Sequence, residues 1–169
     1  MSKETLVRLS ALAAIAGGAL RVVDGLLVPS MSVPVQQSAY FVTDLLLLYG
    51  MCGIYLTRSR RIGFAGFAGF IVFWIGIFMV RSSTLALFGY SAYQIGATVT
   101  LLGAVALGFE MLLRKIFPRL GPVLWTAALF LGMLSLHPAW AGWSVTLAGV
   151  AFGLGFIAAG TSLLKEEFS

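Results

Sequence analysis

The chain has 169 residues, of which 60% are hydrophobic and only 10% charged, and it carries a formal net charge of +5. Soluble domains carry about a quarter of their residues as charged ones, so a water-soluble fold of this length could not bury so much apolar surface. Its Lys and Arg residues are dispersed among apolar stretches and form no basic stripe, which argues against a nucleic-acid surface. Composition therefore indicates a membrane protein.

Six apolar stretches qualify as spanning helices, which need about 20 mostly apolar residues. In chain order they cover residues 5–28, 39–57, 62–80, 85–113, 120–136 and 141–164. The connections between them are short, so none of them is expected to form a soluble domain. The sequence predicts an all-α integral membrane protein, a six-transmembrane-helix bundle in which residues 1–169 form a single polytopic domain.

The orientation of the predicted bundle follows from its basic residues, which collect in every second connection. They are Lys3 and Arg8, then Arg58, Arg60 and Arg61, then Arg114, Lys115 and Arg119, and last Lys165. Only Arg21 and Arg81 depart from this pattern. Short loops rich in Lys and Arg remain in the cytoplasm. We therefore expect cytoplasmic N- and C-termini in a multi-pass protein of the plasma membrane.

The turn "LLRKIFPRLGPVLW" carries basic residues and a proline that enters the next span. In this turn and in its overall layout, the chain resembles small polytopic membrane proteins of bacteria. The resemblance implies a bacterial cytoplasmic membrane, and it transfers neither an activity nor a functional residue.

Small residues along the third and sixth stretches predict close helix packing. Gly63, Gly66 and Gly69 recur at intervals of three, and Gly149 and Gly153 are four apart. Glycines at these spacings let two helix backbones approach closely. The partner helix can lie within the same bundle, in a second copy of the chain, or in a partner membrane subunit.

Polar residues inside the apolar stretches predict a cluster at one level of the membrane, near its extracytoplasmic surface. Charged side chains inside a bilayer are costly, so each needs a partner or a wet cavity. Four stretches contribute to this cluster, and its members are Arg21, Asp24, Asp44, Arg81, Tyr90, Tyr93 and Gln94. The two arginines balance the two aspartates in formal charge.

Two interpretations of this cluster remain open. In the first, Arg21 pairs with Asp24, three residues away on the same helix face. Asp44 likewise pairs with Arg81, and the charges only tie helix ends together. In the second, the cluster is an outward-opening polar pocket, because its tyrosines and Gln94 add hydrogen-bonding capacity that two ion pairs do not need.

Motifs for catalysis or for cofactors are absent from the sequence. It has no HExxH helix, P-loop or dinucleotide fingerprint, and its single histidine cannot build a multi-histidine site within one chain. We therefore expect no catalytic residue, no metal and no cofactor. Glu110 is expected to pair with Arg114 one helical turn later.

Function divides into classes that the sequence does not separate. We favour a protein that binds or transports a small or amphipathic ligand through the polar cluster. The alternative is a non-catalytic accessory or assembly subunit, with the glycine faces as its interfaces, and an intramembrane enzyme comes third. Membrane lipids are the expected partners, together with a second copy or a partner subunit, and nucleic acid is not.

Overall fold

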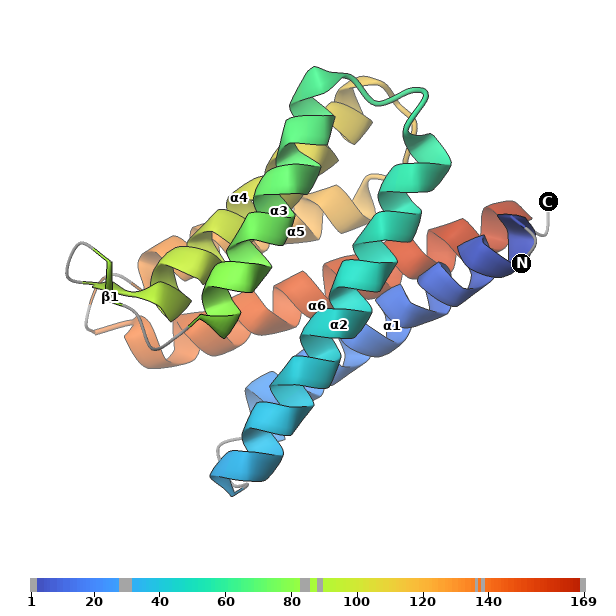
Figure 1. Ribbon diagram of the computed structural model, residues 1–169. Helices are drawn as coiled ribbons and strands as arrows, with labels where there is room; N and C mark the ends of the chain where they lie inside the picture. Colours follow the sequence, from blue (N-terminus) through green and yellow to red (C-terminus); the bar gives the residue numbers. More distant parts are fainter. Residues whose placement is uncertain are drawn as a thin grey trace.

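The structure is a computed structural model that describes residues 3–27, 32–82, 86–87, 90–135, 137 and 139–167. Within these ranges the chain forms six helices: α1 (Lys3–Leu27), α2 (Val33–Arg58), α3 (Phe64–Arg81), α4 (Ala92–Leu113), α5 (Leu120–Leu134) and α6 (Ala141–Glu167) (Figure 1). Two short antiparallel strands, β1 (Ala86–Leu87) and β2 (Tyr90–Ser91), precede α4. The predicted helical bundle is confirmed.

Five of these helices are long and apolar enough to cross a membrane, and α5 is the exception. It has 15 residues, which at 1.5 Å per residue makes it about 22 Å long, against about 30 Å for a bilayer core. The fourth stretch, predicted as one helix over residues 85–113, also differs from the structure. Residues 86–87 and 90–91 pair as strands, and the helix begins only at Ala92.

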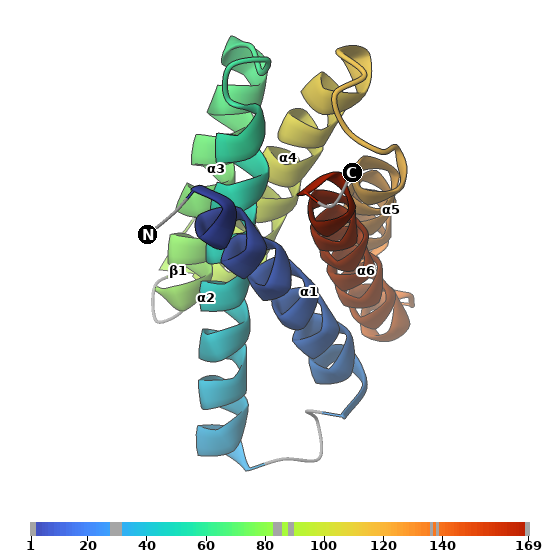
Figure 2. The same ribbon diagram turned by 90° about the vertical axis from the view of Figure 1, so that its right-hand side faces the viewer.

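The helices are arranged as a ring in the order α2, α1, α6, α5, α4, α3 (Figure 2). Each helix packs closely on the next one in this order, whereas α2 and α3, which close the ring, contact each other only sparsely. We call this sparse contact the α2–α3 seam.

The two ends of the bundle differ in charge. One end holds the basic connections 59–63 and 114–119 together with the first turn of α1 and the last turn of α6 (Figures 1 and 2). We call it the basic end. The opposite end contains the last turns of α1, α3 and α5 and the first turns of α2, α4 and α6. We call it the cavity end, after the cavity described below.

Glycines bring neighbouring helices into backbone contact inside the ring. A side chain added at Gly103 of α4 would lie 2.6 Å from the carbonyl oxygen of Gly69 on α3, and Gly18 of α1 and Gly153 of α6 face each other at a similarly short distance. Because no side chain separates them, the backbones gain van der Waals contact along the crossing.

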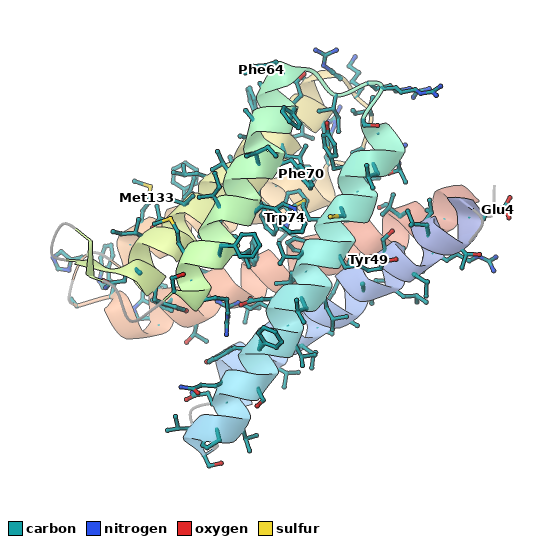
Figure 3. All side chains as sticks on the ribbon, viewed as in Figure 1. Glu4, Tyr49, Phe64, Phe70, Trp74 and Met133 are labelled. Atoms are coloured by element: carbon teal, nitrogen blue, oxygen red, sulfur yellow. The ribbon has the colours of Figure 1, made fainter. Side chains whose placement is uncertain are left out.

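The α2–α3 seam is filled by aromatic rings instead. Tyr55 of α2 stacks on Phe70 of α3 with ring centroids 4.4 Å apart, and Phe70 meets Trp74 edge-on at 6.2 Å. Figure 3 shows Phe70 and Trp74 between the two helices. Large rings therefore bridge two helices whose backbones do not approach each other closely.

Candidate binding cavity

A cavity of about 720 Å³ lies inside the ring toward the cavity end, and all six helices contribute to its lining. We call it the central cavity. Its volume falls within the range of about 300–1,000 Å³ that is typical of small-molecule sites. The polar and charged residues that line it include Arg21, Tyr40, Asp44, Arg81, Tyr93, Gln94, Thr98, Thr100 and Ser135.

An ion pair across the α2–α3 seam forms one wall of the cavity. A guanidinium nitrogen of Arg81 contacts a carboxylate oxygen of Asp44, and the Arg81 side chain is 31% exposed whereas that of Asp44 is only 12% exposed. The pair therefore joins a buried carboxylate to a guanidinium that remains partly hydrated at the end of α3. The structure thus pairs Asp44 with Arg81, as the first interpretation of the cluster expects.

Arg21 lies on the α1 side of the cavity. Its side chain is half-buried and runs along α6, where a side chain added at Gly149 would lie 3.7 Å from its Nε atom. The guanidinium is hydrogen-bonded to the Tyr93 hydroxyl and interacts electrostatically with the Asp44 carboxylate. Glycine at position 149 thus leaves room for the arginine to point inward.

Asp24 does not pair with Arg21, contrary to the first interpretation of the cluster. Its carboxylate is buried and accepts a hydrogen bond of 2.9 Å from the hydroxyl of Thr43, which is also buried. Asp24 is absent from the cavity lining. Residues three apart on a helix differ by about 60° in direction, and here Asp24 turns toward α2 while Arg21 turns toward α6.

The rest of the cavity lining is apolar. It consists largely of aliphatic and aromatic side chains, among them Leu47, Ile77, Leu101, Leu129 and Phe152 deeper in the bundle and Val145 near the start of α6. From Gln94 to Leu101 the lining descends seven residues along α4, which is about 10 Å. The cavity therefore has a polar part near the cavity end and an apolar part below it.

Of the residues predicted for the polar cluster, five line the cavity: Arg21, Asp44, Arg81, Tyr93 and Gln94. Asp24 lies beside it on Thr43. The backbone of Tyr90 belongs to β2, and its side chain falls outside the part of the chain that the structure describes.

The predicted packing glycines have different environments. Gly69 and Gly153 lie in helix crossings, whereas Gly66 lies against the side chains of Ile62 and Glu110. Gly63 precedes α3 and its backbone N–H donates to the Glu110 carboxylate at 3.0 Å. Gly149 adjoins Arg21 and lines the central cavity.

Glu110 lies at the basic end, where it connects α4 to the start of α3, and it does not line the cavity. Besides the Gly63 N–H, its carboxylate is paired with Arg114, four residues later on the same helix. Nearby, the guanidinium of Arg58 lies 5.5 Å from the ring centroid of Phe117. These contacts hold the connection before α3 against the end of α4.

Sequence reasoning missed several of the residues that build the site. Thr43 was not considered, although its position beside Asp44 in an apolar stretch was a signal for a buried polar contact. Tyr40 is not part of the predicted polar cluster, but it lines the cavity. The lining residues within α5 and α6 are apolar or glycine, so in the sequence nothing distinguishes them from ordinary core residues.

Comparison with known proteins adds no assignment: the chain matches no family model, no curated protein and no solved structure. Among the described residues, no group of three or more His, Cys, Asp or Glu side chains gathers in a geometry that could hold a metal ion. The bundle itself is apolar in the manner of a helical membrane protein.

Proposed function

We propose that this chain is a multi-pass membrane protein that binds or transports a small or amphipathic ligand in the central cavity. In this proposal both termini face the cytoplasm, the cavity end faces outward, and the membrane is the plasma membrane of a bacterial type. The observation that carries it is the convergence of five residues of the predicted polar cluster, from four helices, on one cavity whose other lining residues are mostly apolar.

Packing of the glycines supports the binding function over the accessory-subunit alternative. That alternative assigned the glycine faces of the third and sixth helices to a partner, but Gly69 and Gly153 are covered by α4 and α1 of the same chain. A partner would have to use another surface. Ion pairs alone would also be enough to tie the helix ends, whereas here the Asp44–Arg81 pair lies beside a cavity of about 720 Å³ that further polar side chains line.

The binding proposal is tested by filling the cavity. Ala97 lines the cavity, and Ala16 is an exposed position on α1, so Ala97→Trp and Ala16→Trp add the same bulk inside and outside the site. Each protein is purified in a neutral detergent, and the small molecules that it retains are extracted and identified by mass spectrometry.

We expect the unmodified protein and Ala16→Trp to retain the same compound, and Ala97→Trp to lose it. Equal retention by all three proteins would mean that binding does not use the cavity. Stoichiometric co-purification of another membrane protein with all three, without such a compound, would favour the accessory subunit.

A further inference from the structure

The charges that line the central cavity do not balance. Two guanidinium groups, those of Arg21 and Arg81, face a single lining carboxylate, that of Asp44. The second aspartate of the region, Asp24, accepts a hydrogen bond from Thr43 and does not line the cavity. The lining therefore carries one formal positive charge more than its negative charges neutralise.

The excess charge belongs to Arg21. Asp44 is engaged by Arg81, and among the residues described no carboxylate lies within ion-pair distance of the Arg21 guanidinium. Arg21 has instead the neutral hydroxyl of Tyr93. Because its side chain runs along α6 at Gly149, it points into the bundle and not along the lipid-facing surface.

Arg21 therefore interacts with Asp44 only at longer range, and none of the described carboxylates forms an ion pair with it. A charged side chain at membrane depth is costly unless it is paired or hydrated, and arginine presents a planar set of donors that suits carboxylate and phosphate groups. An anion that enters the cavity would meet a lining that contains both Arg21 and Arg81, and the Tyr93 hydroxyl that is hydrogen-bonded to Arg21.

We propose that the occupant of the central cavity is a single-chain amphiphile with one anionic head, a carboxylate or a phosphate monoester. The head binds between Arg21 and Arg81, and the hydrocarbon chain lies against the apolar wall formed by residues such as Leu101, Leu129 and Phe152. This inference rests on the proposed binding function and names the chemical class of its ligand. The volume of about 720 Å³ suits one chain of drug-like size.

The test uses photoreactive amphiphiles of identical chain length that differ only in the head: carboxylate, phosphate, hydroxyl or trimethylammonium. Each probe carries a diazirine on its chain and is irradiated with the full-length protein in a neutral detergent. Intact mass spectrometry measures the labelled fraction, and peptide mapping locates the label. Ala97→Trp, which fills the cavity, identifies labelling that depends on it.

We expect both anionic probes to label cavity-lining segments of α4, α5 and α6 at least about tenfold more than the hydroxyl and ammonium probes, as a charge-assisted hydrogen bond implies. The ratio of carboxylate to phosphate labelling distinguishes the two possible sources of the anion. Arg21→Gln should lower the anionic labelling about tenfold, and Arg21→Lys should lower it less. Arg119→Gln, which removes an exposed arginine at the basic end, should leave it unchanged.

Cavity-dependent labelling that is equal for anionic and hydroxyl heads would overturn this inference while leaving the proposed function intact. A preference for the ammonium head would also overturn it, because the head would then pair with Asp44. Labelling with every probe that Ala97→Trp does not reduce would overturn both proposals. The head-group series on the unmodified chain decides between these outcomes even if Arg21→Gln does not fold.

Discussion

At the scale of single residues, the contact between Asp24 and Thr43 shows how a carboxylate is accommodated inside the bundle. Both side chains are almost fully buried, and the threonine hydroxyl donates to the carboxylate across the α1–α2 interface. A buried acceptor that loses its donor retains the cost of leaving water without the compensating hydrogen bond. The stability of the α1–α2 pair should therefore depend on the hydroxyl at position 43.

Thr43→Val removes this hydroxyl and keeps the shape of the side chain. We expect it to lower the free energy of unfolding by at least about 1–3 kcal/mol, the cost of an unsatisfied buried polar group, because the Asp24 acceptor is a carboxylate. Thr43→Ser is the matched control: it keeps the hydroxyl and loses one methyl group, which costs about 0.8 kcal/mol. Unfolding midpoints in mixed detergent measure both, and a valine variant as stable as the serine variant would contradict the role given to this hydrogen bond.

Residue identities could be predicted more readily than residue contacts. The cost of charge in a membrane was enough to select Arg21, Asp44 and Arg81, which line one cavity. The direction in which each side chain turns depends on how the helices are rotated about their axes, and hydropathy does not encode this rotation. For that reason the sequence left the pairing of Arg21 with Asp24 open as one of two interpretations, and the structure shows Asp24 hydrogen-bonded by Thr43 instead.

At the scale of helices, the antiparallel pair α3–α4 depends on the absence of side chains at its crossing. Gly69 and Gly76 of α3 lie opposite Gly96 and Gly103 of α4, and a side chain at any of the four would overlap the facing helix. The close approach therefore fixes both the separation of the two helices and the position of Arg81, which ends α3 beside the cavity.

Gly103→Ala should separate α3 from α4, because the added Cβ would meet the backbone of Phe73 and the carbonyl oxygen of Gly69. Overpacking of this kind costs about 1–3 kcal/mol. Gly142→Ala is the control, since nothing lies within 4 Å of the Cβ that it adds and alanine favours a helix. Thermal unfolding in detergent compares the two, and equal melting temperatures would argue against the backbone contact.

Helix boundaries could be predicted in part. Runs of apolar residues located all six helices, but residues 86–91 were included in the fourth because hydropathy reports transfer into an apolar environment and says nothing of backbone conformation. The same limit applies to α5, whose helix ends at Leu134, before the end of its apolar run.

At the scale of the whole molecule, connections rich in basic residues alternate along the chain with connections that have few. This pattern predicts a topology that can be tested directly. The first turn of α1 and the last turn of α6 lie with the connections 59–63 and 114–119, because six helices that alternate in direction return the chain to the same end of the bundle (Figure 1). If the positive-inside rule applies, this whole end faces the cytoplasm. The central cavity then opens toward the other side.

Cysteine labelling measures this orientation. The chain has one cysteine, Cys52, so a Cys52→Ala background allows single cysteines to be introduced at Ser32, Ser59 and Ala139. A membrane-impermeant maleimide should label positions 32 and 139 on intact cells, and position 59 only after permeabilisation. The reverse pattern would invert the topology and would turn the cavity toward the cytoplasm.

The shortness of α5 has a mechanical consequence for the surrounding bilayer. A helix about 22 Å long leaves a mismatch of about 8 Å against a hydrocarbon core of about 30 Å, and lipid adjusts to such a mismatch by thinning locally. The exposed Trp140 and Trp143, whose rings lie 6.4 Å apart where α6 begins, are suited to anchor the displaced interface. Gly132, Met133 and Ser135 at the end of α5 also line the cavity. If α5 crosses the bilayer, we therefore expect local thinning to bring the headgroups and water closer to the central cavity on this flank.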